Sequence, residues 1–210
     1  MNGLSESLSG LGGQLAKLQR PDFNHTRLTR EVLEEWVVSL GITSVLDVGC
    51  GQGFAQVLFV EAGILDWVGV TRGGDVCFCP KPITEADMHF LPFVDSCFAL
   101  VYARHIAEHS LAPLFFLREL ARVASRYVLV IVPEVSVPSL RHQGHVSLLS
   151  DGGWRRLFDL AGLKLLKFKR APYRNPPEFP AGAELRYLLA TCGMVEERRP
   201  SSPCEAGLVK

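Results

Sequence analysis

The sequence of 210 residues predicts an α/β protein built on one mostly parallel β-sheet. Two short apolar runs, at 45–48 and 67–70, indicate buried strands, and a helical pattern at 54–62 lies between them. Strands that are joined through a helix lie parallel to one another. A glycine-rich turn at 49–53 follows the first strand directly, which is typical of α/β proteins that bind a ligand at the carboxyl ends of their strands.

The segment before the first strand predicts a helix. Thr29 suits its N-cap, and Gly41 suits the position just after its last turn. The apolar residues between them share one helical face: Leu33, Trp36, Val37 and Leu40. We expect this helix to lead into the first strand.

The middle of the chain predicts two further strands and a helix. The segment 72–82 holds two glycines, two prolines and two cysteines, so a loop rather than a helix should connect the second and third strands. A short extended piece then reaches Asp87. Strands are expected at 98–103 and 127–132, and Pro113 suits the first turn of a helix between them that ends near residue 124.

The last third predicts a long loop, a helix and two strands. The loop at 134–150 carries two histidines, and loops of this length are often functional. Asp151 can cap a helix whose apolar residues recur at helical spacing up to residue 161. Strands at 163–168 and 185–190 follow, separated by a proline-rich segment.

Length and composition favour one domain. With 48% hydrophobic residues the chain can bury a sizeable core, and two full domains would be cramped. We expect the domain to cover residues 29–194. Residues 1–28 are expected to form an arm or a helical lid, and the charged tail at 195–210 is expected to be disordered.

Charge, hydropathy and cysteine usage indicate a cytoplasmic protein without a membrane or nucleic-acid partner. Lysine plus arginine equals aspartate plus glutamate at 22 each, and the lysine-rich stretch at 164–170 fits the solvated face of an edge strand. No apolar stretch approaches the roughly 20 residues of a membrane span, and the N-terminus lacks a secretory pattern. The six cysteines fit reduced thiols, and Cys77 with Cys79 falls short of a zinc site.

The segment Val45-Leu46-Asp47-Val48-Gly49-Cys50-Gly51-Gln52-Gly53 resembles motif I of the class I S-adenosylmethionine (SAM)-dependent methyltransferases. Its glycine spacing, Gly-x-Gly-x-Gly, differs from the Gly-x-Gly-x-x-Gly of dinucleotide-binding folds. The resemblance implies that Asp47 and the loop residues hold the methionine part of SAM. These loop residues are Gly49, Cys50, Gly51, Gln52 and Gly53.

Further segments resemble the type 11 small-molecule methyltransferases in the correct order. They are Ala86-Asp87-Met88-His89-Phe90-Leu91-Pro92-Phe93, Asp95-Ser96-Cys97-Phe98-Ala99-Leu100-Val101, His105-Ile106-Ala107-Glu108-His109 and Arg118-Glu119-Leu120-Ala121-Arg122-Val123. The resemblance covers roughly residues 30 to 170. It implies a Rossmann-like three-layer sandwich with a seven-stranded, mostly parallel sheet and an antiparallel C-terminal strand.

The resemblance also places the rest of the cofactor site. Asp87 and Met88 should bracket the adenine, and Arg104 should lie near the cofactor at the end of the fourth strand. Thr71 stands where the family usually has an acid that holds the ribose hydroxyls, and a neutral hydroxyl can make only part of that contact.

Four histidines are the candidates for catalysis and substrate binding. His105 directly follows the fourth strand, and its near-neutral pKa suits a general base; His109 lies one helical turn later. His142 and His145 lie on the loop that covers the substrate in this fold, and they are the predicted substrate-binding residues. Together with His109 they could also ligate a metal ion, but because no carboxylate joins them at a suggestive spacing, no metal is expected.

The sequence therefore predicts a methyltransferase that uses SAM, releases S-adenosylhomocysteine and methylates an oxygen or nitrogen of a small molecule. Methyl transfer from a sulfonium needs mainly alignment and exclusion of water. The principal alternative is a degenerate, non-catalytic SAM-binding partner subunit, which the missing acid at Thr71 suggests. An RNA methyltransferase and a nicotinamide (NAD)-dependent oxidoreductase are more distant alternatives.

Overall fold

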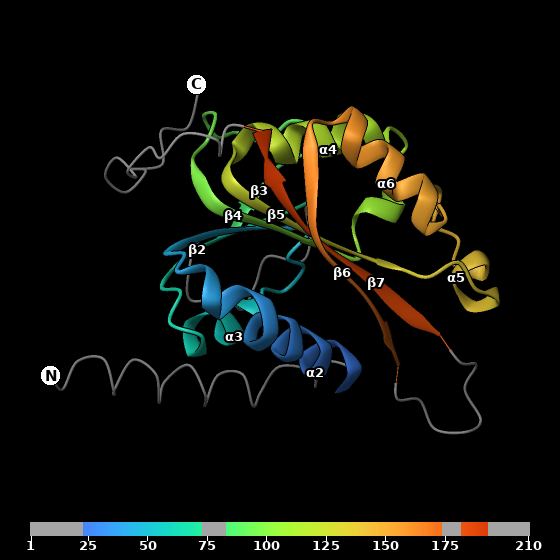
Figure 1. The fold of residues 1–210 in the computed structure, drawn as a ribbon, viewed down its shortest axis with the longest axis horizontal. Coiled ribbons are helices and arrows are strands. Elements are labelled where there is room, and N and C mark those ends of the chain that lie inside the picture. Colours follow the sequence, from blue (N-terminus) through green and yellow to red (C-terminus); the bar gives the residue numbers. More distant parts are fainter. Residues whose placement is uncertain (1–22, 73–82, 174–181, 193–210) are drawn as a thin grey trace, which may run out of the picture.

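A computed structural model describes residues 23–72, 83–173 and 182–192 of the protein. They form a seven-stranded sheet in the order β3-β2-β1-β4-β5-β7-β6 (Figure 1). The strands are β1 (Ser44–Val48), β2 (Asp66–Thr71), β3 (Ile83–Glu85), β4 (Phe98–Arg104), β5 (Ala124–Pro133), β6 (Leu163–Pro172) and β7 (Ala183–Thr191). Strands β1 to β5 pair in parallel, whereas β7 is antiparallel to both β5 and β6. The predicted fold class is confirmed.

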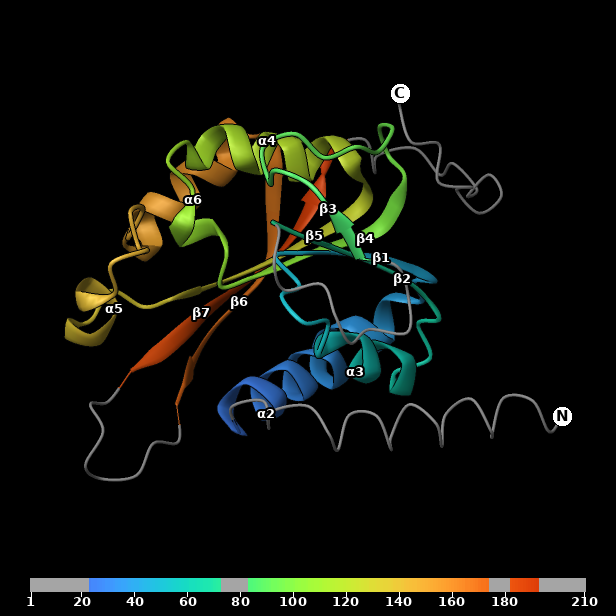
Figure 2. The same cartoon turned by 180° about the vertical axis from the view of Figure 1, so that it is seen from behind.

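Helices cover both faces of the sheet. Figure 2 shows α2 (Phe23–Val32) and α3 (Ala55–Glu61) on one face and α4 (Pro113–Val123) and α6 (Asp151–Leu160) on the other. The remaining helical pieces are η1 (Leu33–Val37), η2 (Val38–Leu40), η3 (Ala107–His109) and α5 (Val137–Arg141). None of the helices within these described segments is long and apolar enough to cross a bilayer.

The central strands are buried on both faces because each face has its own core. Along β1, Val45 packs into the cluster beneath α3, whereas Leu46 and Val48 point to the cluster beneath α4 and α6. Successive side chains of a strand point to opposite faces, so apolar residues at adjacent positions, such as Val45 and Leu46, serve a sheet that is covered on both sides. Two covered faces leave the carboxyl edge of the sheet for a ligand.

Two predicted helix starts are wrong. The helix before β1 already begins at Phe23, so Thr29 lies within it; the Thr29 hydroxyl faces the Tyr102 hydroxyl at 3.4 Å instead of capping the helix. Ser150, not Asp151, caps α6, because the Ser150 hydroxyl accepts a hydrogen bond from the Gly153 N–H. Gly41 ends the first helical segment in the left-handed conformation, as predicted.

The remaining predictions concern the long loop at 134–150, the cysteines and the segments at 72–82 and 195–210. The predicted loop at 134–150 contains the short helix α5, which a capping box at Ser136 and Ser139 begins. The expectation of reduced cysteines is wrong for Cys97, which is disulfide-bonded, because folding brings together sulfur atoms whose spacing in the sequence gives no sign of it. Most of the predicted loop at 72–82, including Cys77 and Cys79, and the predicted tail at 195–210 lie outside the described residues.

Candidate active site

The glycine loop after β1 has the backbone geometry of a ligand cradle. Gly49, Gly51 and Gly53 all have positive φ angles, of 79°, 52° and 79°. The loop is anchored where the Gly49 and Cys50 N–H groups donate to the carbonyl oxygen of Val70, at 2.8 and 3.0 Å. No atom lies within 4 Å of the place where a Cβ on Gly51 would stand, so at this point the backbone itself faces open space.

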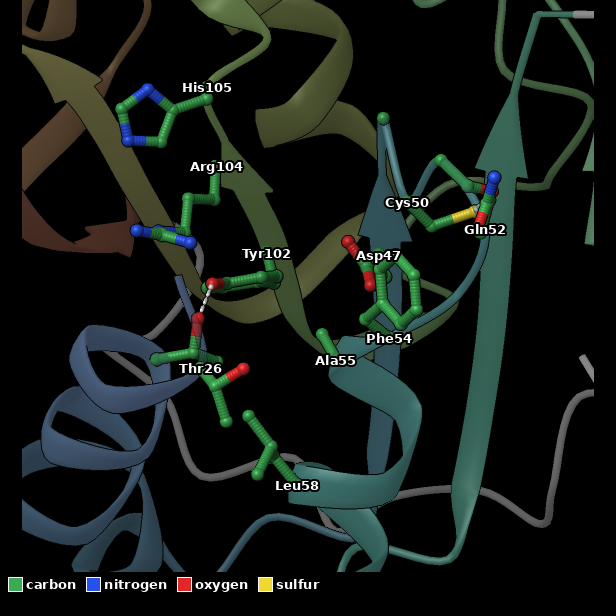
Figure 3. A pocket seen from close by; sticks show the side chains of 13 residues that line it. Thr26, Asp47, Cys50, Gln52, Phe54, Ala55, Leu58, Tyr102, Arg104 and His105 are labelled. Atoms are coloured by element: carbon green, nitrogen blue, oxygen red, sulfur yellow. Dashed lines mark hydrogen bonds between the residues drawn. The ribbon is translucent and has the colours of Figure 1, made fainter. Parts of the chain in front are cut away.

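A cavity of about 360 Å³ lies beside this loop, a volume suited to a small ligand. Figure 3 shows side chains from α2, β1, α3 and β4 around it. Seven of the predicted site residues line it: Asp47, Gly49, Cys50, Gly51, Gln52, Arg104 and His105. The cavity therefore joins the predicted cofactor loop to the predicted catalytic residue.

Asp47 brings a buried carboxyl group to the cavity wall. Its side chain is only 3% exposed, and within the described residues its Oδ2 atom has no hydrogen-bond partner. Burial raises the pKa of Asp47 to about 7, although the Trp67 side chain and the charge of Arg104 act in the opposite direction. A cationic ligand group in the cavity would stabilise the ionised carboxylate.

A buried ion pair holds Arg104 at the end of β4. The Arg104 Nη2 atom lies 2.7 Å from Glu184 Oε2, and Arg186 Nε donates to Glu184 Oε1 at 2.8 Å. Glu184 and Arg186 are fully buried, and Arg104 is nearly so. Although burial raises the pKa of Glu184, the hydrogen bond from His105 and the charge of Arg104 outweigh that effect and hold it at about 2.

His105 occupies a strained position between two carboxylates. Its φ angle is 52°, in the left-handed region that side chains other than glycine seldom adopt. The Nδ1 atom lies 3.3 Å from Glu108 Oε1, and Nε2 lies 3.4 Å from Glu184 Oε2 and 3.5 Å from the Tyr173 hydroxyl. Burial lowers the pKa of His105, but the two carboxylates raise it more, so the net shift is upward. The imidazole thus lies at the cavity edge with a carboxylate near each of its ring nitrogens.

The residues predicted for ribose and adenine lie outside the cavity wall as the described residues define it. Thr71 is buried at the end of β2, and its carbonyl oxygen accepts from the Ala86 N–H. The Asp87 carboxylate accepts from the backbone N–H and Nδ1 of His89, and these hydrogen bonds lower the pKa of Asp87. Met88 packs partly buried against the core. Their assignment to the cofactor stays a prediction.

The structure gathers three of the predicted histidines into one cluster. One ring nitrogen from each of His109, His142 and His145 lies within 4.8 Å of the other two. His105 faces the cavity and is separated from this cluster by the carboxylate of Glu108, which contacts both His105 and His145. The four histidines therefore divide into one residue at the cavity and a group of three behind it.

Several residues around the cavity gave no sign in the sequence. Glu184 lies on β7, far along the chain from Arg104, and no local motif marks it. Glu108 stands inside the quoted resemblance to the family, but only the fold reveals its complete burial. The cavity wall also contains six residues that are not among the predicted site residues: Thr26, Thr29, Phe54, Ala55, Leu58 and Tyr102.

Comparison with known proteins agrees with this architecture. Residues 46–132 match a family model described as a methyltransferase domain, type 11. Together with the sheet order and the glycine loop, this match decides the fold. The chain has the class I SAM-dependent methyltransferase fold. Its five parallel strands and antiparallel β7 are those of that fold, and the resemblance seen in the sequence is confirmed.

Solved structures support the same fold across most of the chain. A SAM-dependent methyltransferase from Archaeoglobus fulgidus has 17% identity and a TM-score of 0.60, covering 79% of this chain and 94% of that one. Magnesium protoporphyrin IX methyltransferase from Synechocystis, with bound S-adenosylhomocysteine, has 12% identity and a TM-score of 0.57 over 90% and 95% of the two chains. No curated protein matches the sequence.

One more relative was solved together with a partner. A Haloferax volcanii protein assigned as a methyltransferase, in complex with the methyltransferase activator Trm112, has 18% identity and a TM-score of 0.61. The match covers 80% of this chain and 96% of that one. At such identities these methyltransferase structures establish the fold, whereas the chemistry must be argued from the site.

Proposed function

We propose that this protein is a SAM-dependent methyltransferase that methylates an oxygen or nitrogen atom of a small molecule. One observation carries the proposal: a glycine cradle, an unpartnered buried carboxylate oxygen on Asp47 and a strained His105 all border the same cavity. A binding loop and a proton-transfer group on one cavity are what a group-transfer reaction requires.

The methionine part of SAM fits the inner end of this cavity. Its ammonium group would donate a hydrogen bond to the Asp47 carboxylate, one oxygen of which has no hydrogen-bond partner among the described residues. The open approach at Gly51 lets backbone N–H groups reach the ligand without interference from a side chain. Thr71 would contact the ribose, and Asp87 with Met88 the adenine. When bound, SAM supplies an electrophilic methyl group on a sulfonium sulfur.

His105 is the proposed proton acceptor for the attacking hydroxyl or amine. Its two ring nitrogens lie 3.3 Å from Glu108 and 3.4 Å from Glu184. The neutral ring carries a proton on only one of these nitrogens, so the other nitrogen would accept the proton of the substrate. These carboxylates also favour the imidazolium that forms when a proton is taken up. Phe54 and Leu58 form an apolar wall that would exclude water from the reacting atoms. His109, His142 and His145 stay outside this proton-transfer step.

A second candidate is a SAM-binding subunit that lacks turnover on its own. Thr71 favours it, because a hydroxyl replaces the acid that the family usually provides for the ribose. The Haloferax relative with its activator shows that a protein of this fold can act with a partner. Cofactor binding without methyl transfer to any acceptor would support this candidate over a self-sufficient enzyme.

The decisive experiment measures cofactor binding by a matched pair of glycine variants. Gly51→Val and Gly41→Val both place a side chain at a left-handed residue with φ near 60°, and neither added Cβ meets an atom within 4 Å. Both should lose stability by about 1–2 kcal/mol or more through backbone strain. Only Gly51 borders the cavity, so only Gly51→Val should abolish binding of SAM and S-adenosylhomocysteine.

Calorimetric titration measures the affinity of each protein for SAM, S-adenosylhomocysteine and NAD. We expect the wild type and Gly41→Val to bind the two sulfur compounds and not NAD. Unchanged binding by Gly51→Val would remove the loop from the cofactor site. Binding of NAD alone would favour the oxidoreductase alternative and contradict the proposed function.

A further inference from the structure

Three imidazole rings meet behind the candidate active site. His109 comes from η3 after β4, whereas His142 and His145 come from the chain that follows α5. The His142 and His145 rings stack at 4.2 Å between centroids, and the His109 ring lies 5.0 Å from His145. We propose that these three residues bind one divalent transition-metal ion of the zinc class.

The hydrogen bonds of the His109 and His145 rings leave the Nε2 atom of each ring available to bind a metal ion. The Nδ1 atom of His109 lies 2.8 Å from the carbonyl oxygen of Gly144, and Nδ1 of His145 lies 3.0 Å from that of Ser139. A carbonyl oxygen can only accept, so each Nδ1 carries the proton and each Nε2 keeps its lone pair. Donation of one ring nitrogen to a backbone carbonyl is the usual way in which a protein orients a metal-binding histidine.

The separation of the nitrogens is close to that of a metal site. They lie within 4.8 Å of one another, and the ligands of a tetrahedral zinc ion at about 2.0–2.1 Å from the metal lie roughly 3.4 Å apart. His142 is exposed, and its Nδ1 atom accepts a hydrogen bond from the Gly144 N–H at 3.2 Å. To bind the ion its ring would give up this hydrogen bond and move inward, without disturbing the core. The same exposure gives an ion access from solvent.

A buried carboxylate beside the cluster would complement the charge of the ion. Glu108 is fully buried, and neither of its oxygens has a hydrogen-bond partner among the described residues. Its Oε1 atom lies 3.9 Å from His145 Nε2, the nitrogen that would face the metal. Among the described residues the Glu108 carboxylate has two nearby imidazoles, His105 at 3.3 Å and His145 at 3.9 Å, and a divalent cation would further offset the cost of burying its charge.

The surrounding backbone already holds the cluster in place. The N–H groups of Val146 and Ser147 both donate to the carbonyl oxygen of Glu108 at 2.9 Å, and the Ser147 hydroxyl donates to the Ser110 carbonyl oxygen. The segment that carries His142 and His145 is thereby tied to η3 next to His109. Ion binding needs only side-chain adjustment, and it would fix this segment beside the cavity.

The donor set selects the class of ion. Imidazole nitrogens suit zinc, copper, nickel and iron, whereas magnesium and calcium prefer oxygen ligands. Three protein nitrogens leave a fourth coordination position for water or for the Glu108 carboxylate. This inference depends on the geometry of the cluster and does not require that the protein binds SAM.

The test is a titration of the full-length, tag-free protein, stripped with a chelator, with Zn²⁺ by calorimetry and with Co²⁺ by absorption. We expect one ion per chain and the visible bands of four-coordinate Co²⁺, without a thiolate charge-transfer band. His142→Ala should weaken binding by at least about 10-fold. Because His142 is exposed, this variant should unfold at the wild-type temperature in the presence of the chelator.

His89→Gln is the matched control, because His89 is a partly buried histidine that bonds Asp87 and Ser110 and lies outside the cluster. It should bind Zn²⁺ as tightly as the wild type. Absence of binding in the wild type would overturn the proposal. Equal affinity of His142→Ala and the wild type, or a thiolate band showing that the ion sits on cysteines, would overturn it as well.

Discussion

Asp47→Asn should stabilise the protein above neutral pH and lower its affinity for the cofactor. In the folded protein burial raises the pKa of Asp47 from 3.8 to about 7. The folded state therefore binds this proton more tightly than the unfolded state, and stability falls as the pH rises from about 4 to about 7. At 1.36 kcal/mol per pKa unit, this loss amounts to about 4 kcal/mol at most.

Asparagine has nearly the same shape and cannot ionise. We therefore expect the free energy of unfolding of Asp47→Asn to exceed that of the wild type at pH 8, by up to about 4 kcal/mol, and to approach it near pH 4. Urea unfolding at several pH values measures the difference. Asp66→Asn is the control, because Asp66 is exposed at the start of β2 and should show no comparable change.

Cofactor affinity should follow the opposite trend. If the ammonium group of S-adenosylhomocysteine pairs with the ionised carboxylate, affinity depends on the ionised fraction of Asp47. With a pKa of about 7 this fraction rises from about one tenth at pH 6 to one half at pH 7, so affinity should rise about fivefold. Asp47→Asn should bind more weakly and lose this pH dependence. A variant that is less stable at pH 8, or that keeps the wild-type pH profile of binding, would refute the reasoning.

Three further predictions concern single side chains. His105→Ala should lower turnover by about 10²- to 10⁴-fold with little effect on the affinity for S-adenosylhomocysteine. The turnover of the wild type should rise with pH through a pKa above 6.5. Equal turnover rates of the variant and the wild type would exclude His105 as the base. Glu184→Gln should lower the free energy of unfolding in urea by about 3–5 kcal/mol, because it leaves the buried Arg104 charge uncompensated. Ser150→Ala should cost about 1 kcal/mol through loss of the α6 cap, whereas Ser150→Asp should keep wild-type stability.

The elements that the sequence predicts correctly are those whose signals are local. An apolar run followed by glycines at alternate positions defines both β1 and the loop after it, because burial and backbone freedom act on adjacent residues. The α4 helix begins at Pro113 and β5 contains the predicted 127–132, since periodicity and proline act within a few residues. The resemblance to the family added the seven-stranded, mostly parallel sheet with an antiparallel C-terminal strand.

The errors arise where a side chain has two uses and the fold selects one. Thr29 is a good capping residue, but it lies inside α2, where its hydroxyl faces Tyr102 from β4. Ser150 and Asp151 are both good caps, and Asp151 instead accepts hydrogen bonds from Tyr187 and Arg155. Which of two possible hydrogen-bond partners a side chain takes depends on residues far along the chain. A local sequence pattern does not contain those residues.

The expectation that no metal ion binds also depends on local spacing, and it stays a prediction. The sequence argues against a metal because no carboxylate accompanies the three histidines at a typical spacing. Glu108 is adjacent to His109 in the chain, yet its contact with His145 arises only when the segment after α5 folds back on η3. Ligand sets assembled from separate segments are visible only after the fold has brought them together.

The buried charges form one connected row from the cavity to the histidine cluster. Arg104 pairs with Glu184 at 2.7 Å, Glu184 contacts His105 at 3.4 Å, His105 contacts Glu108 at 3.3 Å, and Glu108 contacts His145 at 3.9 Å. Buried ion pairs add little net stability, because desolvation offsets their attraction. A role in positioning His105 accounts for this row of charges better than a role in stability. The carboxylates of Glu108 and Glu184 lie near opposite nitrogens of His105, whose backbone is itself strained. In the proposed methyl transfer, this row of charges would hold the His105 imidazole at the cavity edge.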